Sequence, residues 1–276
     1  MAQLIDIKKD FDLGNNFLLK FAESLASKLD GSYRVIVKYD IHNCTFTADK
    51  KNVVLSLSNE LHAGPRYLDD ENVFMFCHNY APLDQWGYPA DHPKILPLPL
   101  GVFFDYDKQV ELTPLRDREY DFCFLGSFPH TGTRDKFKRC LDDLVENTGD
   151  KFKYFIKYTG GFGQGINHDE YMEVVNNTKI CLCPQGSTSN ETFRFFEAIT
   201  LGALPMVEML PRFWYYENSP CTFAKWQFLN THLTRMLSFI DQSSERVEQN
   251  LEQYRNTVLT PDWLAEYFKH KIETKS

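Results

Sequence analysis

Residues 181–207, CLCPQGSTSNETFRFFEAITLGALPMV, carry the pattern that decides the fold of this chain. The order of residue types predicts a strand over 179–183, a polar loop, a short helix over 192–201, a glycine turn and a strand over 203–207. Proline cannot donate to a sheet ladder and glycine frees the backbone, so Pro184 and Gly186 end the first strand. The stretch therefore predicts a β-α-β unit with an open polar loop.

The helix that begins near Thr192 offers a binding place for an anion, because the amides and the positive dipole end of a helix N-terminus attract negative charge. Arg194 lies where its guanidinium can bind two phosphate oxygens, and Glu197 follows three residues later on the same helical face. One charge suits a diphosphate and the other a ribose diol. The alternative is an ion pair within the helix, which leaves the loop and the glycine turn unexplained.

The same stretch resembles the nucleotide-sugar motif of the exostosin-like glycosyltransferases, in which a Cys-Leu-x-Pro-x-Gly segment and a polar loop precede Ser-x-Arg, Glu-Ala, Gly and Pro-Val. The matching positions are Cys181, Leu182, Pro184, Gly186, Arg194, Glu197, Ala198, Gly202, Pro205 and Val207. Gln185 stands where an arginine is common, and Thr192 replaces the usual serine. The resemblance implies an α/β fold of the GT-B type: two facing Rossmann-like domains with a C-terminal crossover helix.

Composition and charge exclude several classes of protein. The chain has 276 residues and a net charge of -8, which argues against broad binding to nucleic acid or anionic membranes. It has no apolar run long enough to span a bilayer, and its first residues lack the apolar core of a signal peptide. Seven cysteines, an odd number, are typical of reduced thiols. We therefore expect a soluble cytoplasmic protein without a transmembrane segment.

Two successive series of strands predict two α/β domains. After a helix over 15–29, the first series has short apolar strands at 34–39, 53–57 and 73–77. The second series alternates with helices, which implies a parallel sheet; its strands are at 121–125, 154–158, 179–183 and 203–207. The expected division is an N-terminal acceptor-side domain over 1–104, a linker over 105–119, a C-terminal nucleotide-sugar-binding domain over 120–258, and a C-terminal helix over 259–276 that returns to the first domain.

Ligands of open α/β sheets collect beyond the carboxyl ends of the strands, and this rule selects the donor-binding candidates. Arg134 begins a helix at such an end, where backbone amides favour anions. For Arg134, an exposed helix residue with an ordinary ion pair is the alternative. The complete set of donor-binding candidates is Gly126, Ser127, Arg134, Tyr158, Pro184, Gln185, Gly186, Ser187, Thr192, Arg194 and Glu197.

Rival motifs for a cofactor or a metal are weaker. Residues 160–165, GGFGQG, follow a strand but lack the glycine spacing of a dinucleotide fingerprint, which disfavours an oxidoreductase. Asp10 with Asp12, and Asp105 with Asp107, have the Asp-x-Asp form that holds a divalent cation in the other large glycosyltransferase fold, but such pairs are common in an acidic chain. We therefore expect no metal and no cofactor, with a UDP-sugar as co-substrate.

Sugar transfer with inversion needs a base that takes the proton of the acceptor hydroxyl. We expect this base in the N-terminal domain, on a loop that follows a strand. Glu60 and His78 lie directly after predicted strands, and Asp70 lies a little further from a strand end. Glu60 is the first candidate, with Asp70 and His78 as alternatives, although a pair with Arg66 would make Glu60 structural.

These features predict an inverting, metal-independent glycosyltransferase that moves a sugar from UDP to a hydroxyl of a glycan acceptor. The alternative is a non-catalytic glycan- or nucleotide-binding module with the same fold. Members of the family that the motif resembles use several UDP-linked sugars, among them xylose. The compact chain is similar to the soluble members encoded by large DNA viruses or bacteria, so a virus-encoded xylosyltransferase is the specific hypothesis.

Overall fold

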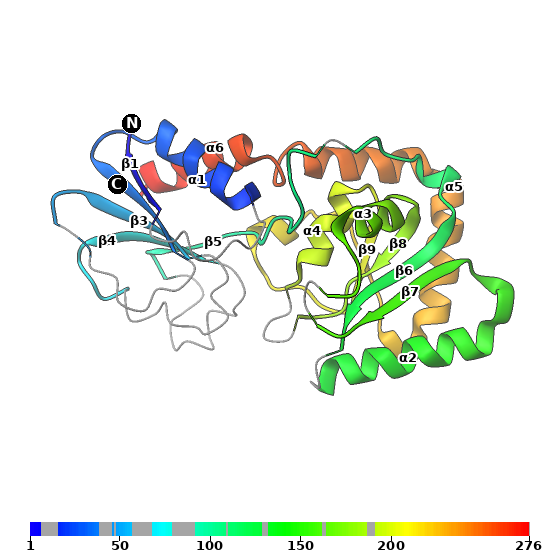
Figure 1. Ribbon diagram of the computed structural model, residues 1–276. Coiled ribbons are helices and arrows are strands. Elements are labelled where there is room, and N and C mark those ends of the chain that lie inside the picture. Colours follow the sequence, from blue (N-terminus) through cyan, green and yellow to red (C-terminus); the bar gives the residue numbers. More distant parts are fainter. Residues whose placement is uncertain are drawn as a thin grey trace. The chain divides into compact units, whose positions relative to one another are not determined.

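The computed structural model describes residues 1–6, 16–38, 46, 48–56, 68–78, 92–108, 110–128, 132–161, 164–186 and 191–275. It divides into two compact units, each with a sheet of its own (Figure 1). Unit 1 comprises Met1–Asp107, Arg212–Glu217 and Asn256–Ser276, and unit 2 comprises Lys108–Pro211 and Asn218–Arg255. The chain therefore enters unit 1 three times, and one of these visits is the short segment Arg212–Glu217.

Unit 1 is built on a five-stranded parallel sheet whose strand order follows the chain. Its strands are β1 (Gln3–Asp6), β2 (Tyr33–Lys38), β3 (Lys51–Ser56), β4 (Val73–His78) and β5 (Ile95–Pro97). The side chains of Val53, Val54 and Leu55 are fully buried, as expected of a parallel strand covered on both faces. β1 and β5 add to the three strands that the sequence predicts here.

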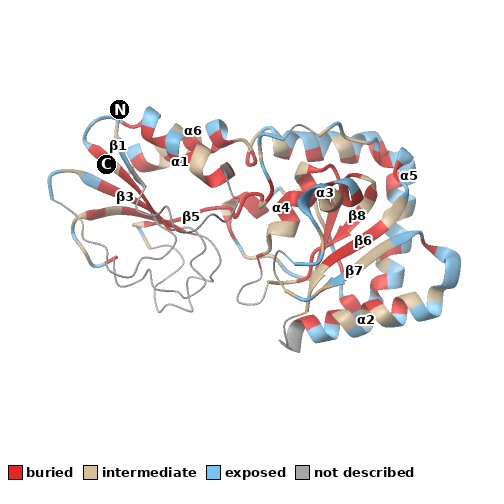
Figure 2. Cartoon of the chain, in the orientation of Figure 1, coloured by how far each residue is buried: buried red, intermediate tan, exposed pale blue. Residues whose placement is uncertain are grey.

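Two helices far apart in the sequence pack side by side in unit 1: α1 (Asn16–Lys28) and α6 (Pro261–Glu273) (Figure 1). Figure 2 shows that their buried residues lie on the sides that face the sheet and each other. Between them the rings of Phe21 and Phe268 meet edge to face, with centres 5.0 Å apart. This apolar contact attaches the C-terminal helix to the N-terminal unit.

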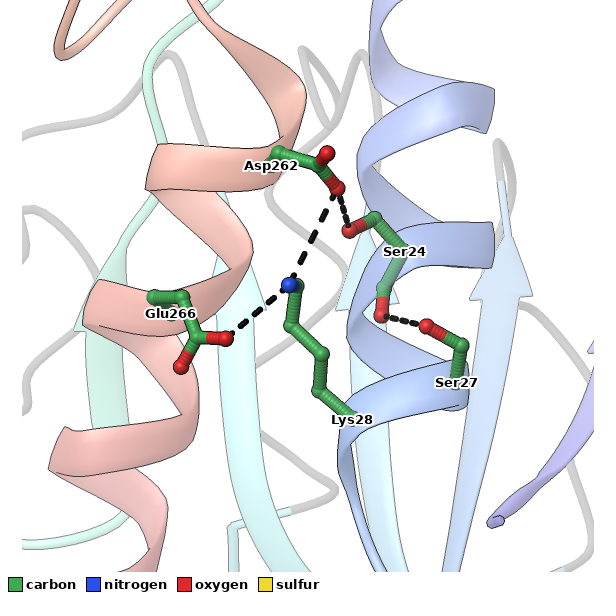
Figure 3. Close-up of polar contacts among 5 residues, drawn as sticks. All are labelled: Ser24, Ser27, Lys28, Asp262 and Glu266. Carbon is green, nitrogen blue, oxygen red and sulfur yellow. Dashed lines mark hydrogen bonds and ion pairs between the residues drawn. The ribbon is translucent and has the colours of Figure 1, made fainter.

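A polar cluster lies along the same pair of helices (Figure 3). Lys28 Nζ is 2.9 Å from Glu266 Oε1 and 3.9 Å from Asp262 Oδ1. The hydroxyl of Ser24 donates to Asp262, and that of Ser27 donates to the Ser24 carbonyl at 2.7 Å. Lysine and serine groups of α1 thus bind the carboxylates of α6.

Unit 2 holds a second five-stranded parallel sheet, with strands in the order β10-β9-β8-β6-β7. Its strands are β6 (Tyr120–Ser127), β7 (Tyr154–Thr159), β8 (Thr178–Leu182), β9 (Leu204–Val207) and β10 (Thr222–Phe223), and its helices are α2 (Gly132–Thr148), α3 (His168–Asn176), α4 (Phe193–Thr200) and α5 (Leu229–Arg255). In Figure 1, α2 lies on one side of the sheet, whereas α3 and α4 lie on the other. The α/β fold class with two parallel sheets is confirmed.

Arg118 anchors the start of unit 2, within the segment 105–119 that the sequence predicts as a linker. Its side chain is 5% exposed and donates to the carbonyls of Thr178 at 2.8 Å and Leu201 at 3.1 Å. Gly202, with φ +73°, leaves room for it, because a Cβ at Gly202 would lie 2.5 Å from Arg118 Nη2. The guanidinium therefore joins the beginning of β8 to the turn after α4.

The 27-residue helix α5 is the largest element that the sequence analysis does not predict. Its buried residues include Leu233, Ile240 and Val247, and non-helical dihedral angles at Ser243 mark a kink. Within the described ranges, none of the helices combines the length and apolar character that crossing a bilayer requires.

Candidate functional site

The strand order of unit 2 reverses between β6 and β8. β6 lies between β7 on one side and β8 on the other. The connection from β6 to β7 and the connection from β7 to β8 therefore cross opposite faces of the sheet. In doubly wound sheets with this order, ligands bind in the crevice outside the carboxyl ends of the two strands at the reversal. The described strands of unit 1 follow the chain order and have no such reversal. The ends of β6 and β8 are therefore the candidate site.

Arg134, in the first turn of α2, bridges these two strand ends. Its Nη1 donates to the carbonyl of Ser127 at 2.8 Å, and its Nε donates to the carbonyl of Gln185 at 2.7 Å. Ser127 ends β6, and Gln185 follows β8. The side chain of Arg134 is only 8% exposed, so the alternative of an exposed helix residue does not hold.

Arg194, in the first turn of α4, lies against the end of β6. Its Nε and Nη2 donate to the Leu125 carbonyl at 3.0 and 2.7 Å, and its guanidinium carbon is 4.9 Å from the centre of the Phe124 ring. Gly126 makes room for the guanidinium, because a Cβ at that position would lie 2.2 Å from Nη2. The third nitrogen, Nη1, is buried and finds no hydrogen-bond acceptor among the described residues.

The two guanidinium groups concentrate positive charge at the strand-order reversal. Burial and the charge of Arg194 lower the pKa of Arg134 to about 10. Burial also acts to lower the pKa of Arg194, but electrostatic interactions with its acidic neighbours, among them Tyr171 and Glu197, raise it above its ordinary value. Both side chains therefore stay protonated at neutral pH, and the site attracts anions.

Glu197, in the second turn of α4, is held by a different helix. Its side chain is 7% exposed, and its Oε2 accepts a hydrogen bond of 2.7 Å from the hydroxyl of Tyr171 on α3. These bonds direct Arg194 to β6 and Glu197 to α3, so an ion pair within the helix does not account for the two side chains. Tyr171 is not among the residues that the sequence singles out.

Other donor-binding candidates lie between β8 and α4 in the sequence. Thr192 is the residue that caps α4, and its hydroxyl makes no capping hydrogen bond. Pro184, two residues after the end of β8, is buried, whereas Gly186 is partly exposed. Ser187 lies outside the described residues.

Tyr158 is bound to α2. Its hydroxyl donates to Asp142 Oδ1 at 2.6 Å, and Lys138 Nζ lies 4.8 Å from the centre of its ring. Burial and the charge of Asp142 raise the pKa of Tyr158 well above its usual range. The phenol therefore donates a hydrogen bond to α2, while part of its ring stays exposed.

The candidate bases belong to unit 1, and two of them lie at opposite ends of one strand. His78 ends β4; its side chain is 1% exposed, and its carbonyl accepts a hydrogen bond of 2.8 Å from the amide of Leu98. Asp70 lies in the turn before β4, where its Oδ1 accepts from the Asn72 amide at 2.9 Å. Glu60 lies outside the described residues.

The acidic pairs considered as metal ligands are placed as follows. Asp107 forms an ion pair with Lys20 of α1, and Asp105 Oδ1 accepts from the Asp107 amide at 3.1 Å. Asp10 and Asp12 lie outside the described residues. Across the part of the chain that the structure describes, no group of three His, Cys, Asp or Glu side chains is arranged to hold a metal ion.

The family model of the RXYLT1 C-terminal domain matches residues 104–258. The match spans 155 of the 276 residues, counted from 104 to 258, and includes all the donor-binding candidates. The chain belongs to the RXYLT1 C-terminal domain family. This family is xylosyltransferase-like and exostosin-related, so the resemblance to exostosin-like glycosyltransferases is confirmed. A comparison with curated proteins found no match.

Two solved structures share the fold of this RXYLT1-family chain. The crystal structure of alpha1,3-fucosyltransferase is 12% identical, with a TM-score of 0.50 over 99% of this chain and 92% of that chain. The crystal structure of accessory secretory protein 1, 2 and 3 in Streptococcus pneumoniae is 8% identical, with a TM-score of 0.53 over 94% of this chain and 57% of that chain. This chain thus spans little more than half the length of the second protein. The GT-B-like fold class is confirmed.

Proposed function

We propose that this protein transfers a sugar from a UDP-sugar to a hydroxyl of a glycan acceptor, and that unit 2 binds the donor at the ends of β6 and β8. Family membership supports glycosyl transfer in general. The observation that carries the proposal is the pair of charged arginines, Arg134 and Arg194, at the one strand-order reversal among the described sheets. This is the place where such a sheet binds a nucleotide.

The diphosphate of the donor is assigned to Arg194 and the N-terminus of α4. Nη1 of Arg194 is a buried donor without a described acceptor, and such a group costs free energy until an acceptor reaches it. A phosphate oxygen is a suitable acceptor. The first backbone amides of α4 add donors at the same helix end, and so does the hydroxyl of Thr192, which makes no capping hydrogen bond.

The ribose is assigned to Glu197. A carboxylate is an acceptor only, and a vicinal diol offers it two hydroxyl donors. Glu197 lies one helical turn after Arg194, so an anion and a sugar that are covalently linked can bind the two side chains at once.

The reaction that we propose inverts the anomeric carbon. The oxygen of the acceptor hydroxyl forms a bond to this carbon while the bond from the carbon to the diphosphate oxygen breaks, and a base takes the hydroxyl proton. Arg194 and the helix amides stabilise the charge that builds on the departing UDP, so no metal ion is needed for that task. Glu60 is the first candidate base, because the deep burial of His78 separates its ring from solvent and Asp70 lies at the amino end of its strand.

Xylose is the sugar that we propose, on the support of a xylosyltransferase-like family. The test measures the melting temperature of the protein with UDP-xylose, UDP-glucose, UDP-galactose, UDP-glucuronic acid and UDP-N-acetylglucosamine, with a GDP-sugar as the nucleotide control. A ligand that binds the folded state raises the melting temperature according to its affinity. We expect the UDP-sugars to stabilise the protein and UDP-xylose to do so most.

Mass analysis of a glycan acceptor incubated with the best donor then measures transfer. A mass increase of one sugar supports the enzyme. Binding without transfer or donor hydrolysis identifies the non-catalytic module instead, and stabilisation by the GDP-sugar alone contradicts the assignment of UDP.

A further inference from the structure

The buried carboxylate of Glu197 is held from outside its own helix. Tyr171 lies in the first turn of α3, before β8, and Glu197 lies on α4, after β8. The 2.7 Å bond from the Tyr171 hydroxyl to Glu197 Oε2 therefore joins the helix before β8 to the helix after it. A side chain that is 7% exposed has little water to orient it, so this bond defines one oxygen of the carboxylate.

The direction of the bond is set by the chemistry of the two groups. Burial and the charge of Glu197 raise the pKa of the Tyr171 phenol well above its usual range, so the phenol keeps its proton. A protonated phenol is a donor, and an ionised carboxylate is an acceptor only. The bond is therefore charge-assisted, the stronger kind of hydrogen bond.

We propose that Tyr171 is a positioning residue for donor recognition: its hydroxyl holds the Glu197 carboxylate in the orientation that binds the ribose diol. The proposal rests on the donor site of the proposed function and adds a residue that contacts the carboxylate and not the nucleotide. Selection of a ribonucleotide over a 2′-deoxyribonucleotide depends on this orientation, because a hydrogen-bonding site rejects an analogue that lacks the hydroxyl.

The experiment compares dissociation constants of UDP and 2′-deoxy-UDP by calorimetry for the wild type, Tyr171→Phe, Glu197→Gln and the double variant. We expect the wild type to bind UDP about 10-fold or more tightly than 2′-deoxy-UDP, which is the contribution of one hydrogen bond to a charged group. Tyr171→Phe should weaken UDP binding by about 5- to 10-fold, change 2′-deoxy-UDP binding by less than about twofold, and so remove most of the preference. In the double variant, Tyr171→Phe should add nothing to the effect of Glu197→Gln on this preference.

The matched control is Tyr154→Phe, which removes the hydroxyl of a tyrosine at the amino end of β7 in the same unit. It should leave both dissociation constants unchanged. The melting temperature of each variant without nucleotide reports on the fold.

The outcomes separate this inference from the proposed function. If Glu197→Gln keeps the wild-type preference for UDP, Glu197 does not bind the ribose and the donor assignment fails together with the inference. If Glu197→Gln removes the preference but Tyr171→Phe keeps it, only the inference is overturned. Equal weakening of both nucleotides in Tyr171→Phe, or loss of its folded state, also overturns the inference, because the hydroxyl would then serve the structure in general.

Discussion

Gly126 and Arg194 are complementary in shape: the glycine lacks a side chain at the place that the arginine fills. A Cβ on Gly126 would lie 2.2 Å from Nη2 and 3.3 Å from the guanidinium carbon of Arg194. The backbone of β6 thus provides both the space for the guanidinium and, through the Leu125 carbonyl, an acceptor for two of its nitrogens. The position of Arg194 depends on a glycine at the strand end.

Gly126→Ala should weaken UDP binding while the fold is kept. The clash falls on the end of a flexible side chain, so the guanidinium moves and its bonds to Leu125 are lost. We expect a loss of UDP affinity that approaches the loss in Arg194→Ala, about 1.5–3 kcal/mol for hydrogen bonds to a charged group. Calorimetry with UDP measures both variants.

The control for this prediction is Gly31→Ala, because among the described residues a Cβ at Gly31 would have one atom within 4 Å, the Met1 carbonyl oxygen at 3.9 Å. In the double variant, Gly126→Ala should add nothing to the effect of Arg194→Ala, since the two changes remove the same interaction. Additive losses, or unchanged affinity in Arg194→Ala, would show that Gly126 does not act through Arg194.

Arg134→Met should lower the stability of unit 2 as well as UDP binding. The variant keeps an apolar stem but removes the donor of two part-buried hydrogen bonds, to the carbonyls of Ser127 and Gln185, at a cost of about 0.5–1.5 kcal/mol for each bond. Chemical denaturation without nucleotide measures the free energy of unfolding. Arg139→Met, an exposed arginine on the same helix, is the control; an equal effect of the two variants would contradict the bridging role of Arg134.

The local elements could be predicted from the sequence, because their signals are local. Helical spacing of apolar residues indicates α1, and Pro184 and Gly186 mark the end of β8. Short edge strands have no such signal. β10 has two residues, and it is a strand because Thr222 and Phe223 pair with β9. That pairing belongs to the folded chain and not to the segment.

The candidate site could be predicted in part for the same reason. The spacing of Arg194 and Glu197 is visible along one helix. Their partners are not: Leu125 offers a backbone carbonyl, which every residue has, and Tyr171 lies 26 residues before Glu197. The strand order that places β6 beside β8 brings these groups together, and a sequence read segment by segment does not contain it.

The contact between α1 and α6 should lose part of its strength in acid. The hydrogen bond from Lys28 lowers the pKa of Glu266. A carboxyl group whose pKa is lower in the folded protein than in the unfolded chain stabilises the fold at pH values above its pKa in the unfolded chain, which is about 4.3 for glutamate. This contribution is lost as the pH falls through the pKa of the group in the folded protein. Glu266→Gln should therefore lower the melting temperature slightly at about pH 7 and not at about pH 3.

The control for the acid effect is Glu23→Gln, which removes an exposed glutamate of α1. The difference in melting temperature between Glu23→Gln and the wild type should be about the same at the two pH values. A difference between Glu266→Gln and the wild type that is equal at both pH values would mean that the bond to Lys28 is not responsible.

Metal ions should be dispensable for transfer, because Arg194 and the α4 amides are assigned the charge of the departing diphosphate. We expect the turnover rate to stay within about twofold of the untreated value after treatment with EDTA and removal of the chelator. The groups assigned to stabilise the departing diphosphate belong to the protein itself, so the chelator does not remove them. Product formation from UDP-xylose measures it. Loss of transfer that Mn²⁺ restores would assign the diphosphate to a cation instead.

The catalytic base should affect the chemical step and not donor binding. Glu60→Gln keeps the shape of the side chain but removes its basicity, so kcat should fall by about 10²- to 10⁴-fold, the usual share of general-base catalysis. The dissociation constant of UDP should stay near the wild-type value, because unit 2 is assigned the donor. Steady-state kinetics and calorimetry on the same preparation measure the two quantities. If Glu60→Gln keeps the wild-type turnover, the role of the base moves to Asp70 or His78. If Asp70→Asn and His78→Asn keep it as well, the base lies elsewhere or the reaction retains configuration.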